Sequence, residues 1–177
     1  MIRRRPKRPA FTLLEILLVL VILVALSAML YPTLAGMYGD VRVKAAADDV
    51  QAAWTEARAH AIEDGRSYRF AVQHGTGKFK VAPDADSFWD GSGQQDENAA
   101  PPYVQESELP SSILFDIPAD LPNVGGWSTV VVFNPDGGCN QDIEVVLKED
   151  DDETAPVIVK VRAMTGAISV RRKTGDR

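Results

Sequence analysis

The longest run of hydrophobic positions in the chain lies near its N-terminus, from Leu13 to Met29. Its length is close to the roughly 20 apolar residues that an α-helix needs to cross a bilayer. Glu15 is the only strongly polar side chain within the run. The pattern predicts a transmembrane helix over residues 11–32 that carries one carboxylate near its start.

A second helical pattern follows the first. Apolar side chains recur every three or four positions between Val43 and Ala61, and polar or charged side chains occupy most of the other positions. Gly65 is the type of residue that commonly follows the C-terminus of a helix. Residues 33–65 are therefore expected to continue the helix, with an apolar face that packs against a sheet.

Beyond Gly65 the period of the hydrophobic pattern changes to two, which is typical of β-strands. Residues 67–72 and 78–81 flank a glycine-rich turn and predict a hairpin. Further short apolar runs bounded by turn residues predict strands at 113–117, 129–133, 143–147, 157–161 and 168–170. Residues 66–177 are expected to form an antiparallel β domain, most simply a meander.

The segment at about 83–112 interrupts the strand pattern. It is rich in Asp, Gly, Gln and Pro, which favour loops over regular elements. We predict an exposed polar loop, long for a compact domain, with Phe88, Trp89 and Tyr103 as candidate anchors. Such a loop either carries partner contacts or is a tolerated insertion.

The residues that precede the apolar run form a purely basic leader. Its five cations are Arg3, Arg4, Arg5, Lys7 and Arg8, and it contains no carboxylate. By the positive-inside rule, this charge keeps the N-terminus in the cytoplasm and sends the rest of the chain outward. An acidic residue at the centre of a membrane helix costs about 2.5 to 3.5 kcal/mol, and less near the end. Glu15 is thus either a carboxylate at headgroup level or one that has a partner.

The basic leader, the small residue Ala10, the phrase Phe11-Thr12-Leu13-Leu14-Glu15 and the apolar helix resemble the N-terminus of type IV prepilins and type II secretion pseudopilins. The resemblance implies that prepilin peptidase cleaves between Ala10 and Phe11, removing residues 1–10, and that the new Phe11 amine is methylated. In that family the glutamate at the position of Glu15 pairs with the N-terminal amine of a neighbouring subunit. One difference is that Ala10 stands where the family usually has Gly.

Motifs further along the chain resemble the GspH/FimT group of minor pseudopilins: Ala57-Arg58, Val132-Phe133-Asn134-Pro135-Asp136-Gly137 and Thr165-Gly166. The implied fold is α+β and type IV pilin-like, with a long N-terminal α-helix, transmembrane in its first half, packed on a C-terminal antiparallel β-sheet domain. The implied function is a minor pseudopilin that assembles through its helix into a type II secretion pseudopilus and supports protein export across the outer membrane.

The same resemblance implies the partners and the location of the protein. The partners are other pseudopilins of the same filament, prepilin peptidase, the inner membrane and secreted cargo. The location is the inner membrane, with a single pass, a cytoplasmic N-terminus and a periplasmic C-terminal domain, and then the assembled filament. A competing interpretation is an ordinary secretory signal peptide cut near Ala25, Ser27 or Ala28, or a signal-anchored β domain that forms no filament.

The charge distribution supports a second hypothesis. Removing the five-cation leader from a formal net charge of −6 leaves −11 on the remaining side chains, which argues against a general nucleic-acid surface. Basic residues nevertheless gather at the C-terminus, where Arg171, Arg172 and Lys173 are candidate phosphate contacts. The GspH/FimT group includes minor type IV pilins that bind DNA for uptake through such residues. The alternatives are a solvated tail or a contact with an acidic neighbour.

Catalytic and metal-binding motifs are not found in the sequence. It contains no serine elbow, no metal-spaced His or Cys set and no phosphate loop, so we predict no enzyme, no cofactor and no metal site. The acidic run Glu149–Glu153 raises a calcium hypothesis, although a solvated turn between strands is the usual role of such a run. Cys139 is the only cysteine, which excludes an intrachain disulfide.

Overall fold

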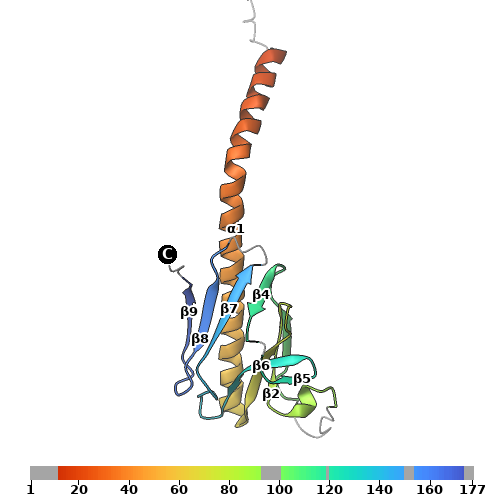
Figure 1. Ribbon diagram of the computed structural model, residues 1–177, viewed down its shortest axis with the longest axis vertical. Helices are drawn as coiled ribbons and strands as arrows, with labels where there is room; N and C mark the ends of the chain where they lie inside the picture. Colours follow the sequence, from red (N-terminus) through yellow and green to blue (C-terminus); the bar gives the residue numbers. More distant parts are fainter. Residues whose placement is uncertain (1–11, 93–100, 119, 150–153, 174–177) are drawn as a thin grey trace, which may run out of the picture. The chain divides into compact units, whose positions relative to one another are not determined.

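The computed structural model describes residues 12–92, 101–118, 120–149 and 154–173, and for residues 29–37 it describes the backbone alone. One helix, α1 (Leu13–Asp64), is continuous over 52 residues and is followed by short strands (Figure 1). The chain divides into an N-terminal unit that ends at Tyr38 and a C-terminal unit that begins at Gly39. The second half of α1 thus belongs to the same unit as the strands.

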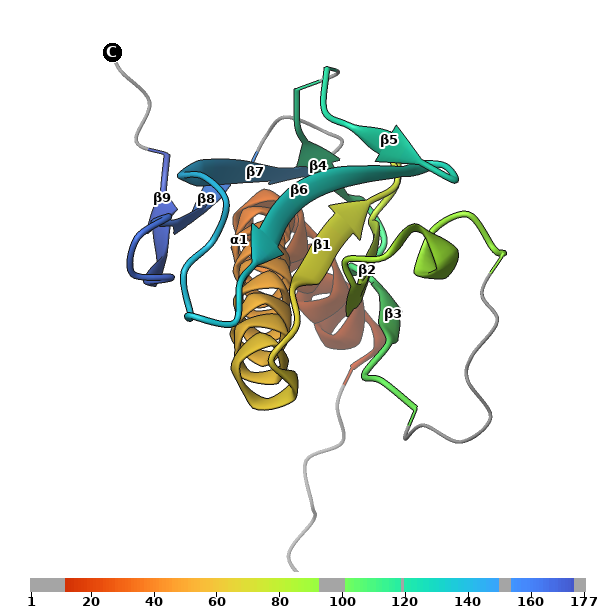
Figure 2. The same cartoon turned by 90° about the horizontal axis from the view of Figure 1, so that it is seen from below.

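The C-terminal unit contains two antiparallel sheets (Figures 1 and 2), with strand orders β3-β2-β1-β6-β5 and β4-β7-β8-β9. The strands are β1 (Tyr68–Val72), β2 (Lys78–Pro83), β3 (Gln105–Glu108), β4 (Ile113–Asp116), β5 (Asn123–Val124), β6 (Trp127–Phe133), β7 (Ile143–Glu149), β8 (Val157–Val161) and β9 (Ile168–Arg172). A long helix with antiparallel sheets packed on it confirms the predicted α+β pilin-like fold class.

The strand pairing differs from the expected meander. β1 pairs with both β2 and β6, and β4 pairs with β7, so strands distant in the sequence lie side by side. The chain leaves the first sheet after β3, adds β4 to the second sheet, and returns to the first with β5 and β6. Residues of both sheets pack on the apolar helix face.

The hydrophobic core joins this helix face to both sheets. Trp54 is fully buried at its centre, where its ring meets Phe70 edge-on at 5.7 Å and Phe133 at 6.4 Å. Most helix residues around Trp54 that enter the core are alanine or valine, which lets the strands approach the helix closely. Inward residues of β7 and β8, such as Val145 and Val159, complete the same core.

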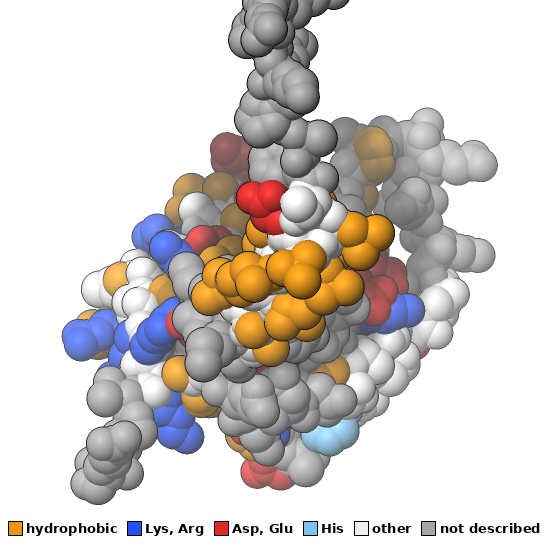
Figure 3. Space-filling view, turned by 90° about the horizontal axis from the view of Figure 1, so that it is seen from above, with side chains coloured by type: hydrophobic (Ala, Val, Ile, Leu, Met, Phe, Trp, Pro, Cys, Tyr) orange, Lys and Arg blue, Asp and Glu red, His pale blue; other side chains and the backbone are white. Residues whose placement is uncertain are grey.

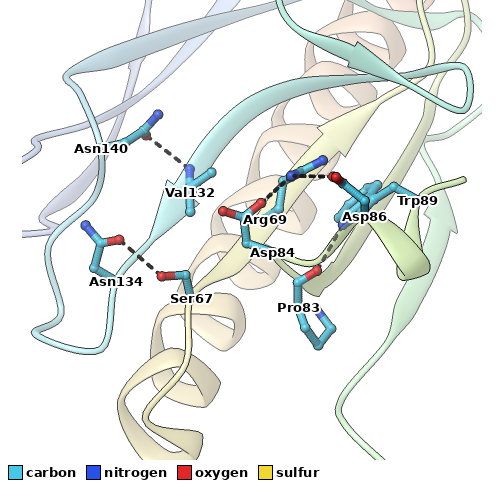
Figure 4. A network of polar contacts seen from close by, with 9 residues as sticks. All are labelled: Ser67, Arg69, Pro83, Asp84, Asp86, Trp89, Val132, Asn134 and Asn140. Atoms are coloured by element: carbon cyan, nitrogen blue, oxygen red, sulfur yellow. Dashed lines mark hydrogen bonds and ion pairs between the residues drawn. The ribbon is translucent and has the colours of Figure 1, made fainter. Parts of the chain in front are cut away.

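The segment expected to be an exposed loop contains regular and buried structure. It includes a short 3-10 helix, η1 (Asp86–Phe88), and the strand β3. Trp89 is only 3% exposed, and it packs with Trp127 against the first sheet, on the side away from the main core. Its indole N–H donates to the Pro83 carbonyl at 2.9 Å (Figure 4). The candidate anchor Trp89 therefore contributes a second, smaller apolar cluster.

Tyr103, in the same segment, contacts residues near the C-terminal end of α1. Its ring stacks on His60 with 4.1 Å between centroids, and its hydroxyl donates to Glu56 Oε2 at 2.6 Å. Nearby, the Tyr68 hydroxyl donates to Asp64 Oδ2 at 2.5 Å. The two tyrosines thus tie the strands and the loop to carboxylates of the last helical turns.

These contacts predict that the hydroxyls of Tyr68 and Tyr103 lose their protons at a higher pH than ordinary tyrosines. Burial, followed by the hydrogen bond to Asp64, raises the pKa of Tyr68 to about 12, and burial together with Glu56 also raises the pKa of Tyr103. Since the folded chain holds both protons more tightly than the unfolded chain, this contribution to stability is complete below about pH 10 and is lost as the pH rises through about 12. Ultraviolet absorbance titration should show a late tyrosinate phase that shrinks in Tyr68→Phe and Tyr103→Phe. An unchanged titration curve in both variants would contradict the assignment.

Candidate functional site

The start of α1 holds Glu15, the predicted assembly residue. The Glu15 backbone N–H donates to Thr12 Oγ1 at 3.2 Å and to the Thr12 carbonyl at 3.1 Å. A threonine cap with a glutamate three residues later has the spacing of a capping box, and a carboxylate in the first turn is also favoured by the helix dipole. Thr12 is a helix-capping residue that the sequence analysis did not single out, although its spacing from Glu15 could have revealed it. Ala10 and Phe11 lie outside the described residues.

The first half of α1 exposes apolar side chains around its whole circumference. The large apolar side chains between Leu13 and Leu26 are 47% to 83% exposed, and Figure 3 shows hydrophobic side chains crowded at this end of the helix. The Ser27 hydroxyl donates to the Leu23 carbonyl at 2.8 Å, so the helix satisfies this polar group itself. A helix that is apolar on all sides requires apolar surroundings, which other helices or lipid provide.

One shallow groove on this surface follows the helical repeat. It is lined by Thr12, Leu13, Ile16, Leu17 and Leu20, at the spacing typical of helix–helix packing. The residues whose side chains are described include no helix both long and apolar enough to span a bilayer. The transmembrane prediction for residues 11–32 is not confirmed.

The predicted phosphate contacts at the C-terminus are partly occupied within the chain. Arg171 Nη2 contacts both carboxylate oxygens of Glu144, at 3.1 and 3.3 Å, and Lys160 Nζ donates to the same group at 2.8 Å. The hydrogen bond from Lys160 is the main cause of the lowered pKa of Glu144. Arg172 Nη2 lies 3.1 Å from Asp40 Oδ2, and Lys173 is exposed beyond the strand. A phosphate would have to compete with two carboxylates for these arginines.

The first residue of the acidic run, Glu149, is buried and is not part of a solvated turn. Glu149 is 3% exposed, and its carboxylate accepts from Arg42 Nη2 at 2.7 Å, Thr154 Oγ1 at 2.7 Å and Ser112 Oγ at 3.2 Å. Asp150–Glu153 lie outside the described residues. Within the described part of the chain, no three His, Cys, Asp or Glu side chains are placed to hold a metal ion. Glu149 therefore acts as a buried anchor for the helix rather than as an open carboxylate.

The structure brings together three motifs that are distant in the sequence. Arg58 Nε donates to the Gly137 carbonyl at 2.7 Å, and Gly166 lies against both Arg58 and that carbonyl. Gly137 and Gly166 adopt positive φ angles of 81° and 58°, which favour glycine. The helix residue Arg58 thus fixes the turn after β6 and the turn between β8 and β9.

Comparisons with known proteins agree with these features. The family described as the prokaryotic N-terminal methylation motif matches residues 5–31. The fold is similar to that of the minor pseudopilin EpsH from the Type 2 Secretion System of Vibrio cholerae, with 13% identity and a TM-score of 0.53 over 74% of this chain and 97% of the EpsH chain. No curated protein gives a significant match. The motif and the fold confirm the predicted resemblance to type IV pilin-like proteins.

Proposed function

We propose that this chain, type IV pilin-like by its N-terminal motif and its fold, is a minor pseudopilin that enters a type II secretion filament and supports protein export across the outer membrane. The observation that carries the proposal is the start of α1, where a fully apolar surface from Leu13 to Leu26 carries a single carboxylate, Glu15, in its first turn. Its partners are other pseudopilins and prepilin peptidase.

The apolar surface supplies the driving force for helix packing. Burying a Leu, Ile or Val side chain completely contributes about 1.5 to 3 kcal/mol relative to leaving it exposed. Twelve such side chains between Leu13 and Leu26 are about half exposed or more, so their burial offers on the order of 10 kcal/mol before the costs of association. This gain is not specific for one register, because the whole circumference is apolar.

The Glu15 carboxylate fixes the register, which is the axial position of one packed helix relative to the next. Cleavage before Phe11 leaves a cationic amine four residues from Glu15, in a surface that otherwise has no charge. When helices stack, each Glu15 carboxylate pairs with the Phe11 amine of a neighbour. A buried ion pair has its best-attested role in fixing such a register, since an unpaired buried charge is costly.

The five-cation leader sets the orientation that this assembly needs. It holds the N-terminus in the cytoplasm, places residues 11–32 across the inner membrane and leaves the β domain of residues 66–177 in the periplasm. Residues 33–65 then link the membrane segment to the β domain. Removal of residues 1–10 by the peptidase frees the Phe11 amine on the cytoplasmic side.

Processing by prepilin peptidase tests the proposal. The full chain co-expressed with active peptidase should begin at Phe11, as read by mass spectrometry of the N-terminal peptide. Ala10→Gly, which restores the residue usual before the cut, should be processed faster, and a catalytically inactive peptidase is the matched control. An N-terminus after Ala25, Ser27 or Ala28, or an unprocessed Met1, would contradict the proposal.

A further inference from the structure

We infer that the basic edge strand β9 of one copy docks beside the acidic edge strand β3 of a second copy, which makes a head-to-tail contact between their C-terminal units. The inference adds a contact to the proposed function, and it rests on the arrangement of charges at two sheet edges. The N-terminal helix can assemble without it, so the two proposals can fail separately.

Both strands are the outermost members of their sheets. β3 ends the order β3-β2-β1-β6-β5, and β9 ends the order β4-β7-β8-β9. Each pairs with one neighbour only within the described residues. The other side of an edge strand presents backbone N–H and C=O groups that can pair with another chain. The side chains along each edge therefore decide which strand can approach.

The outward face of the second sheet carries a carboxylate on β7 and cations on the two outer strands, β8 and β9. Glu144 on β7 lies opposite Lys160 on β8, and Arg171 on β9 contacts the same Glu144. The side chains of Arg171 and Arg172 remain 59% and 53% exposed despite their ion pairs. Figure 3 shows Lys and Arg side chains gathered on the side of the C-terminal unit that carries β9.

The first sheet carries cations on β2 and carboxylates on its edge strand β3. Glu108 on β3 lies opposite Lys78 on β2, and Glu106 lies opposite Lys80. Glu106 and Glu108 are exposed, and together with Lys78 and Ser107 they line a shallow hollow at this edge. The last charges of this sheet are therefore negative.

Joining the two edges places the cations of β9 next to the carboxylates of β3. Arg171 and Lys173 of one copy come beside Glu106 and Glu108 of the next, and opposite charges on neighbouring strands stabilise their pairing. A β9–β9 or β3–β3 contact sets like charges side by side, so a symmetric dimer is disfavoured. A contact between unlike surfaces is heterologous, so repeating it gives a closed ring if the rotation between copies closes and an open row of subunits if it does not.

The overall charge sets the conditions under which the contact forms. Residues 39–177 have a formal net charge of −10, because the preceding residues contribute five cations and one carboxylate to the total of −6. Two copies therefore repel each other at long range in dilute buffer. At about 0.1 M salt the screening length falls to about 10 Å, which leaves the close pairs at the edges to act.

A zero-length cross-link tests the contact directly. Unlabelled and heavy-nitrogen-labelled full chains, mixed equally in mild detergent, are treated with a carbodiimide, which couples amines to neighbouring carboxylates. Peptides that join Lys173 to Glu106 or Glu108 should contain one light and one heavy partner in about half of the cases. Links found only within one isotope, or no such links, would overturn the inference.

Charge reversal provides the second measurement, with sedimentation of the full chain as the readout. Glu106→Lys with Glu108→Lys should weaken association at least tenfold, and so should Arg171→Glu with Lys173→Glu. Mixing the two variants should restore association. The matched control reverses two exposed carboxylates of α1, Asp48→Lys with Asp49→Lys, and should not weaken it.

The outcomes separate this contact from simple solubility and from the proposed function. If the edge charges serve only to keep strands apart, reversal leaves association unchanged and mixing has no effect, which would overturn the inference. Melting temperatures identify a variant that fails to fold, and the other edge variant then decides. Processing at Phe11 is read on the same samples and is independent of either edge.

Discussion

The Gly166→Ala variant is expected to lose about 3 kcal/mol of unfolding free energy, far more than an exposed turn position loses. Gly166 has a φ of 58°, a conformation that costs a non-glycine residue about 1 to 2 kcal/mol. A Cβ atom at this position would also overlap the Gly137 carbonyl oxygen and the Arg58 side chain. The turn would have to move, and the hydrogen bond from Arg58 to Gly137 would be strained or lost.

Gly75→Ala is the matched control for this prediction. Gly75 has a similar φ of 72°, but a Cβ atom built there meets nothing within 4 Å. Its expected loss is about 1 kcal/mol, from the backbone conformation alone. Chemical denaturation of both variants gives the two values. Equal losses would show that the packing of Arg58 between the two turns contributes nothing to stability.

Glu15→Gln is expected to reduce incorporation into filaments at least tenfold while leaving the helix start intact. Gln at this position keeps the capping box with Thr12, whose contact with residue 15 uses the backbone N–H. It removes only the negative charge. Leaving a buried Phe11 amine without its counter-ion costs about 3 to 5 kcal/mol, which is more than a hundredfold in an association constant.

Two further variants at position 15 separate the effect of the negative charge from the effect of the helix cap. Glu15→Leu also removes the capping carboxylate, so it should be at least as defective as Glu15→Gln. Glu15→Asp keeps the charge on a shorter side chain and should retain part of the function. Quantifying each chain in the filament and membrane fractions measures the effect. Wild-type incorporation of Glu15→Gln would mean that Glu15 serves the helix start only.

Much of the fold follows from local pattern. The change from a three-to-four-residue period to a period of two near Gly65 correctly predicts where α1 ends and β1 begins. Strands such as Val157–Val161 are visible because an apolar run is bounded by turn residues. By contrast, β3 is the polar stretch Gln105–Glu108, and its strand conformation comes from pairing with β2. No hydrophobic signal marks it.

The order of strands and the partners of charges required the structure. Arg42 and Glu149 are distant in the sequence, and nothing local distinguishes Glu149 from the acidic residues that follow it. Similarly, the basic residues near the C-terminus look free in the sequence, while Arg171 and Arg172 each contact a carboxylate from another element. Such pairs depend on tertiary packing, which periodicity does not encode.

The most direct test of filament membership is the composition of filaments sheared from cells that express the full chain and purified away from membranes. The account predicts that peptides of this chain are present, that its N-terminal peptide begins with a methylated Phe11, and that Glu15→Gln removes it from the fraction. A chain that stays entirely with the membranes, with Met1 intact, would contradict the account.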